Sequence, residues 1–229
     1  MPVEKKMKGE FLITMKILTS EYILADFFMK GENFTAPASH IMPSQVHGKN
    51  IIVINDDNIS DFVLPKRPEA DGILLLTSRA GASLRFADCA PVMIWAEKWV
   101  MILHSGYKGT VLNISREGLE IVSNIFGRKA AINSNAWIGP CIGREYFRKS
   151  DDEWTVKGIN AFHRENYDVK DGHVYFDLSG EIKSQLIDCG LNGKNIKLSG
   201  IDTLHDDRCC SYRRGDIHER MTLFVKLIQ

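Results

Sequence analysis

The 229-residue sequence has no charge excess and no long apolar run, and both absences narrow the classes of protein that it can encode. Lys plus Arg and Asp plus Glu both number 29, so the formal net charge is zero. A balanced chain has no general electrostatic attraction for nucleic acid or an anionic membrane, and we expect neither as a partner. Lys16 and Glu21 interrupt the apolar N-terminal stretch, so it contains neither a signal h-region nor the ~18 apolar residues of a membrane helix. The sequence therefore predicts a cytoplasmic protein.

A disulfide framework is also lacking. The five cysteines are odd in number and lack the spacing of a secreted disulfide framework, so we expect reduced thiols. Internal repeats, low-complexity segments and linkers are lacking too, and the longest polar stretches, residues 55–61 and 66–72, are short enough to be loops. With 44% hydrophobic and 25% charged residues, the composition predicts an ordinary globular protein with one domain over residues 1–229.

Local sequence patterns predict many strands and about three helices. Strands are expected at residues 11–18, 51–54, 72–77, 83–86, 91–96, 99–104, 130–139, 173–177 and 222–228. Helices are expected at residues 110–127, 151–166 and 177–190, which carry helical apolar spacing, acidic N-termini or a terminal glycine. Because strands and helices do not strictly alternate, we predict a mixed α/β fold, an α+β sandwich.

Cys89 and His104 flank a predicted hairpin whose turn is at the polar residues 97–98. A turn at this point places His104 opposite Pro91, and Cys89 opposite Gly106. Side chains alternate between the faces of a strand, so Cys89 and His104 become diagonal neighbours on one face, with Cβ atoms ~7 Å apart. Both can then reach one metal ion at ~2.0–2.3 Å. A register shift of one residue would put them on opposite faces.

A thiolate and an imidazole together suit zinc or copper, and a catalytic zinc site has three protein ligands and an open position. We favour His47 as the third ligand because it lies in the turn-forming stretch "PSQVHGKN", beside Gly48. The other candidate histidines are His40, His163, His173, His205 and His218. The alternative without a metal is a small core cysteine and unrelated histidines.

Seven segments of the chain occur together in one order: "QVHG" (45–48), "ADG" (70–72), "FADCAPVMIW" (86–95), "LHSGYKGT" (103–110), "WIGPCIG" (137–143), "FDLS" (176–179) and "CCSYRR" (209–214). In this combination the chain, from about residue 43 to its end, resembles the laccase-like, YfiH-type family. That family was long labelled multicopper polyphenol oxidase and was later described as purine nucleoside phosphorylases. The resemblance implies an α/β sandwich with the site in a surface pocket.

The resemblance also implies a ligand set and an activity. The family's zinc ligands correspond to His47, Cys89 and His104, which would also be the catalytic centre. The implied chemistry is phosphorolysis of adenosine, inosine or methylthioadenosine, with adenosine deamination as a further activity. A multicopper oxidase needs about ten His and Cys ligands for its copper centres. Seven histidines, only three of them in matching motifs, disfavour that reaction, whereas a single Cu²⁺ at the same three ligands stays open.

Several positions depart from the family pattern. The segment before Gln45 is shorter than usual, the usual Trp-Arg is Tyr107-Lys108, and two cysteines, at 209 and 210, precede "SYRR". Nucleoside and phosphate are the expected small-molecule partners, with Lys108 and Arg213 as phosphate-binding candidates. Arg214 is the third cation of these motifs, and the alternative for both arginines is a structural salt bridge or a solvated face. The altered pocket leaves a second class open, a non-catalytic metal-binding or cell-envelope-associated protein. The sequence does not predict an oligomeric state.

Four further residues of these motifs are expected to be structural. Asp88 precedes the cysteine ligand and points to the opposite face of a strand, which predicts a backbone-anchoring role. Cys141 is expected to pack in a tight loop rather than to act as a fourth ligand. Cys209 and Cys210 are expected in the core or the pocket wall, because adjacent residues of a strand chelate one ion poorly.

Overall fold

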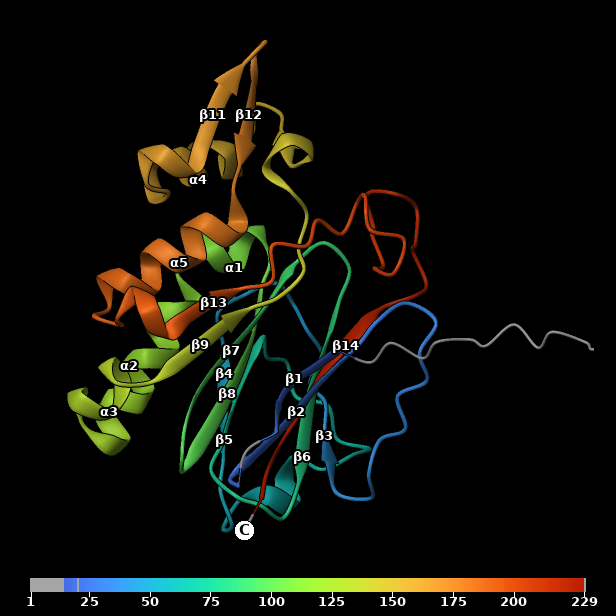
Figure 1. Cartoon of the computed structure of the whole chain (residues 1–229), viewed down its shortest axis with the longest axis vertical. Helices are drawn as coiled ribbons and strands as arrows, with labels where there is room; N and C mark the ends of the chain where they lie inside the picture. The colour runs from blue at the N-terminus through green and yellow to red at the C-terminus, as the bar shows by residue number, and fades with distance from the viewer. Residues whose placement is uncertain (1–14, 20, 229) are drawn as a thin grey trace, which may run out of the picture.

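The computed structural model describes residues 15–19 and 21–228, which form three β-sheets and five α-helices (Figure 1). The strand predicted at residues 11–18 is described only as β1, Met15–Thr19, and residues 11–14 lie outside the described residues. None of the helices in the described residues is long and apolar enough to cross a membrane.

A six-stranded sheet with the order β13-β9-β7-β8-β5-β4 lies between two other layers (Figure 1). Its strands are β4 (Ile51–Ile54), β5 (Gly72–Leu75), β7 (Ala90–Ala96), β8 (Trp99–Ser105), β9 (Asn135–Ile138) and β13 (Ile196–Leu198). β4 and β5 are parallel, as are β13 and β9, and the remaining pairs are antiparallel. The sheet is therefore mixed, as the irregular order of predicted strands and helices indicated.

A five-stranded sheet with the order β1-β2-β14-β6-β3 covers one face of the six-stranded sheet. Its other strands are β2 (Ile23–Phe28), β3 (His40–Ile41), β6 (Gly81–Phe86) and β14 (Met221–Leu227). A small antiparallel sheet protrudes from one end of the molecule (Figure 1) and consists of β10 (Arg148–Lys149), β11 (Tyr167–Lys170) and β12 (His173–Phe176).

Helices cover the other face of the six-stranded sheet. They are α1 (Tyr107–Val111), α2 (Ile114–Phe126), α3 (Arg128–Ile132) and α5 (Leu178–Asp188), whereas α4 (Glu153–Ala161) lies beside the small sheet and contacts α1 (Figure 1). Short 3₁₀ turns lie at Ile59–Asp61, Arg144–Tyr146, Arg164–Asn166 and Gly193–Asn195. The Asp152 and Asp177 carboxylates accept hydrogen bonds from the backbone N–H groups of Thr155 and Gly180, at 2.7 and 2.8 Å, and thereby begin α4 and α5.

Three expectations about local structure are wrong. The helix expected over residues 151–166 ends at Ala161, and a separate 3₁₀ turn follows at Arg164–Asn166. Residues 130–139 are a strand only from Asn135, because α3 occupies the first half of the segment. The helix expected over residues 110–127 is broken at Asn113, which has a left-handed backbone (φ 56°) and caps α2 by accepting a hydrogen bond from Arg116 N. The apolar spacing continues across the break, so it did not reveal the interruption.

The central strands bury both of their faces. In β8, Met101 and Leu103 pack against the helices, whereas Val100 and Ile102 pack against the five-stranded sheet. This two-sided burial explains why these strands appear in the sequence as continuous apolar runs rather than as alternating ones. A rigid hairpin buried in this way is a suitable support for side chains at its ends.

Candidate metal centre

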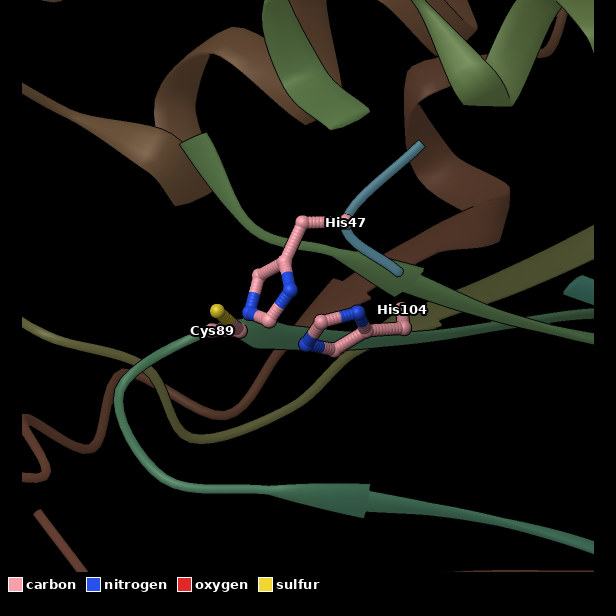
Figure 2. A group of neighbouring side chains, drawn as sticks. All are labelled: His47, Cys89 and His104. Atoms are coloured by element: carbon pink, nitrogen blue, oxygen red, sulfur yellow. The ribbon is translucent and has the colours of Figure 1, made fainter. Parts of the chain in front are cut away.

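The hairpin of β7 and β8 has the predicted register. His104 pairs with Pro91, and Ser105 pairs with Ala90, so Cys89 lies directly before the first paired residue of β7. Figure 2 shows the Cys89 thiol and the imidazole rings of His47 and His104 gathered in one group, with His47 coming from the loop before β4. One ligand atom from each of the three residues lies within 4.8 Å of the other two.

The backbone turn that carries His47 is held by the carboxylate of Asp71, which directly precedes β5 and is fully buried. Asp71 accepts hydrogen bonds from three consecutive backbone N–H groups: Val46 at 3.2 Å, His47 at 3.0 Å and Gly48 at 2.7 Å. These bonds stabilise a tight turn in which His47 has a left-handed backbone, φ 59°. Such a conformation is uncommon outside glycine and is often found at functional sites.

The same Asp71 also orients His104. Its Oδ1 atom lies 2.8 Å from His104 Nδ1, and both side chains are buried. A proton on Nδ1, donated to Asp71, leaves His104 Nε2 as the ligand atom directed toward Cys89. One carboxylate therefore fixes two of the three candidate ligands, in the way that carboxylates orient histidines in known metal sites.

Cys89 is held in place by a second carboxylate and by a glycine. Asp88 (φ 76°) accepts hydrogen bonds from Thr203 Oγ1 at 2.7 Å and from the Arg213 backbone N–H at 2.7 Å. Asp88 thus anchors backbone as expected, but the expected position on a strand is wrong: it lies in a left-handed bend between β6 and β7 and lines the same cavity as Cys89. At Gly106, a Cβ atom would lie 2.6 Å from Cys89 Sγ, so only glycine leaves room for the thiol beside β8.

The pKa values of the group favour a charged pair in the absence of a metal. Burial would raise the pKa of Cys89, but the charge of His104 and hydrogen bonds from both histidines lower it to about 6. Burial would lower the pKa of His104, but the Cys89 thiolate and Asp71 raise it to about 9. Between these two values the metal-free site holds a thiolate next to an imidazolium, and the thiolate is the form that binds metal.

We expect iodoacetamide to alkylate Cys89 in metal-free protein with a half-maximal rate near pH 6, because the thiolate is the reactive form and the pKa of Cys89 is about 6. The rate should fall as the pH drops below that value, while bound metal should block the reaction. Mass spectrometry of the peptide containing Cys89 measures both effects. A half-maximal rate near the ~8.5 of an ordinary thiol would contradict this electrostatic account.

The three residues fit a metal ion with nitrogen and sulfur ligands. Zinc–nitrogen and zinc–sulfur bonds of ~2.0–2.3 Å place ligand atoms ~3.5 Å apart around a tetrahedral centre. The observed upper limit of 4.8 Å therefore requires only a small contraction on binding. Within the described residues, the group has no fourth His, Cys, Asp or Glu ligand. Three protein ligands and one open position are the pattern of catalytic rather than structural zinc sites.

The candidate ligands line a cavity of about 1000 Å³. Lys108 and Arg213, the cations selected from the sequence, lie in its wall. The Lys108 ammonium is 5.0 Å from the ring centroid of Trp154, and the Arg213 guanidinium is 6.0 Å from that of Phe147. Tyr107, the neighbour of Lys108, is buried in the same wall and donates a hydrogen bond to the Trp154 carbonyl. Tyr107 and Lys108, which replace the usual Trp-Arg of the family, thus line the same cavity as the candidate metal ligands.

The remaining residues of the sequence motifs lie where packing was expected. Cys141 is buried, and burial raises the pKa of its thiol to about 12. Cys209 and Cys210 lie in the core between the two large sheets, and all five cysteines have free thiols. Arg214 donates hydrogen bonds to backbone carbonyls and to Asp216, which indicates a structural role. The histidines outside the group are His40, His163, His173, His205 and His218.

Sequence reasoning gave Asp71 no role, although it lies in the quoted "ADG" segment. The available signal was a carboxylate directly before a buried strand, followed by a glycine at a position that has no room for a larger residue. At Gly72 a Cβ atom would lie 2.7 Å from Ile51 and 2.8 Å from Leu103. The contact of Asp71 with His104 depends on the antiparallel pairing of β5 with β8, which pairs Gly72 with Leu103. Sequence spacing alone does not show this pairing.

A mixed α/β sandwich with a His-Cys-His group in an open cavity defines a protein with one candidate metal centre among its described residues. The chain belongs to the family described as multi-copper polyphenol oxidoreductase laccase, which matches residues 28–228. The family resemblance that the sequence motifs carry is thereby confirmed.

Two curated relatives of the chain are named purine nucleoside phosphorylase rather than laccase. A purine nucleoside phosphorylase of Rickettsia prowazekii is 27% identical over 204 residues, which cover 86% of this chain and 79% of the relative. A purine nucleoside phosphorylase of Aquifex aeolicus is 23% identical over 231 residues, covering 96% and 98%.

Solved structures share the fold. YfiH from Bacillus licheniformis has a TM-score of 0.76 at 20% identity, covering 90% of this chain and 92% of its own. A Neisseria meningitidis protein has a TM-score of 0.76 at 16% identity, covering 95% and 99%. These similarities confirm the predicted mixed α/β fold.

Proposed function

We propose that this protein is a zinc-dependent purine nucleoside phosphorylase. The observation that carries the proposal is the His47, Cys89 and His104 group in the wall of a large cavity with aromatic and cationic residues. The names of its relatives in Rickettsia prowazekii and Aquifex aeolicus support the same reaction. In that reaction an orthophosphate oxygen bonds to C1′ of the ribose, and the glycosidic electron pair leaves with the purine, which takes up a proton.

His47, Cys89 and His104 would hold the zinc ion in this proposal, with Asp71 fixing the orientation of both histidines. When bound, zinc with an open coordination position supplies a Lewis acid next to the substrate. The protein contributes a buried hairpin that keeps the ligands in place and a cavity large enough for a nucleoside. The same group could hold Cu²⁺, since imidazole and thiolate bind both metals.

The aromatic wall supports binding of a planar base. Phe147 and Trp154 line the cavity beside the buried Tyr107 and offer ring surfaces on which a purine can stack. Lys108 and Arg213 lie over two of these rings and add positive charge near the site of reaction. We therefore place the base at this wall, with the ribose directed toward the candidate ligands.

Incubation of zinc-loaded protein with adenosine, inosine or methylthioadenosine, with and without orthophosphate, tests the reaction. We expect free adenine or hypoxanthine and a sugar 1-phosphate only when phosphate is present, as chromatography of the products would show. Conversion of adenosine into inosine, independent of phosphate, would instead demonstrate the deaminase activity that the family resemblance also implies. If no nucleoside gives a product at full zinc occupancy, the result would contradict the proposed enzymatic activity. It would favour a non-catalytic metal-binding protein.

A further inference from the structure

The cavity is much more positive than the chain as a whole. The formal net charge of the sequence is zero, yet the ionisable side chains of the cavity wall other than His, Cys and Tyr are mostly basic. The basic ones are Arg67, Arg85, Lys108, Lys149, Arg213 and Arg220, and the acidic ones are Asp88 and Asp152. Both acids already accept hydrogen bonds, Asp88 from Thr203 and Asp152 from Thr155. Such a concentration of one sign in a cavity attracts an anionic ligand.

Two of these cations are brought together by the five-stranded sheet. Arg85 in β6 pairs with Thr222 in β14, and Arg220 lies two residues before Thr222. Arg220 directly precedes β14, outside the paired residues, and both arginines line the cavity, where the charge of Arg220 acts on Arg85. Arg85 is also only four residues before Cys89, which limits the distance between their Cα atoms to ~14 Å.

Backbone contacts fix the position of Arg67 and Arg220 without neutralising their charge. Arg67 donates to the carbonyls of Met42 and Pro43, at 3.2 and 3.3 Å. Arg220 donates through Nη1 to the carbonyls of Asp216, Ile217 and Glu219. Each guanidinium keeps further N–H groups for a ligand. These two arginines are thus partly ordered before any ligand binds, which lowers the entropic cost of binding.

Within the described part of the chain, none of Arg67, Arg85 and Arg220 forms an ion pair with a carboxylate, and the Arg85 guanidinium has no hydrogen-bond partner. The Gln45 side chain holds only the Arg85 backbone, accepting from its N–H at 2.8 Å and donating to its carbonyl at 2.9 Å. Partial loss of hydration, followed by the charges of Arg220 and Arg67, lowers the pKa of Arg85. Three like charges held together without an acid are stabilised by a bound oxyanion.

We infer that Arg67, Arg85 and Arg220 form the binding site for the orthophosphate that the proposed phosphorolysis consumes. The inference rests on that proposed function. It replaces Lys108 and Arg213 as the main phosphate ligands, because each of those lies over an aromatic ring on the base-binding wall. Guanidinium groups bind phosphate oxygens with paired hydrogen bonds, which a lysine ammonium cannot do. Orthophosphate, rather than a phosphate ester of the substrate, is the assigned ligand.

The test measures orthophosphate binding by calorimetry in the zinc-loaded protein and in the variants Arg85→Gln and Arg220→Gln. Loss of one charged hydrogen-bonding group should raise the dissociation constant of orthophosphate by ~10–100-fold. The KM for phosphate should rise by a similar factor, while the KM for the nucleoside stays within about twofold, since the base binds elsewhere. Arg85→Lys should give an intermediate dissociation constant, because lysine keeps the positive charge but lacks the paired N–H donors of a guanidinium.

Arg128→Gln is the matched control, since Arg128 begins α3 and does not line the cavity. It should leave orthophosphate binding and both KM values unchanged. Unchanged phosphate binding in Arg85→Gln and Arg220→Gln, or a phosphate KM that responds only to Lys108→Gln, would overturn the inference. Tighter, Arg85-dependent binding of a nucleoside 5′-monophosphate than of orthophosphate would overturn it as well. Arginine-dependent orthophosphate binding without any turnover would support the site and contradict the proposed phosphorolysis, so the two failures are distinguishable.

Discussion

Replacement of Cys89 by alanine is expected to lower zinc affinity by more than ~100-fold, because a residue that only orients a ligand already contributes ~10–100-fold. Cys89 Sγ lies in the group whose ligand atoms are all within 4.8 Å of one another. Its thiolate would also carry the only negative charge among the three ligands. Elemental analysis of protein purified without added metal should show about one zinc ion per chain in the wild type and almost none in the variant.

Cys141→Ala is the matched control for this loss. Cys141 is a buried thiol next to Ile142 of the cavity wall, and its raised pKa of about 12 makes it a poor ligand. This variant should retain about one zinc ion per chain, with a modest loss of stability from the removed sulfur. Zinc retained in Cys89→Ala would contradict the ligand assignment. Loss of zinc from Cys141→Ala would show that a fourth protein ligand closes the site.

The second large effect is expected at Asp71. Each of its two oxygen atoms accepts two hydrogen bonds: Oδ1 from His47 N and His104 Nδ1, and Oδ2 from Val46 N and Gly48 N. Asp71→Asn retains only one acceptor oxygen, so two of the four donors lose their partner. We expect the free energy of unfolding to fall by ~3 kcal/mol. Zinc affinity should fall by ~10–100-fold, since the orientation of both histidines depends on this carboxylate.

Glu181→Gln is the control that separates the loss of stability from the loss of zinc affinity. Glu181 is also fully buried and accepts hydrogen bonds from the backbone of His163 and the side chain of Asn166, but it does not line the cavity. Its substitution should lower the free energy of unfolding without changing zinc affinity. Chelator competition and denaturant titration measure the two quantities independently. Equal zinc affinities in Asp71→Asn and Glu181→Gln would contradict a positioning role for Asp71.

The sequence was sufficient to predict the hairpin and, through it, two members of the site. The turn at residues 97–98 is short and polar between apolar runs, and it determined a register in which His104 pairs with Pro91. His47 was favoured from its local context and then from the family motif. Helix starts at Asp152 and Asp177 were also predictable, because a capping carboxylate acts on backbone groups only three residues away.

The contacts that sequence reasoning missed join strands that are distant along the chain. Asp71 reaches His104 because β5 pairs with β8, and Arg85 lies beside Arg220 because β6 pairs with β14. Neither pairing is encoded in local spacing. The break of the long helix at Asn113 depended on one left-handed residue, which the apolar periodicity did not reveal.

Restoration of metal-stripped protein with zinc tests most directly that the His47, Cys89 and His104 group is the centre of a nucleoside phosphorylase. We predict that purine release from inosine or adenosine is absent after chelation and rises linearly with added zinc. The rise should end at about one equivalent per chain and should require orthophosphate throughout. The same titration of Cys89→Ala should give no activity. Phosphate-dependent purine release that is undiminished in metal-stripped protein, or full zinc occupancy without any purine release, would contradict the account.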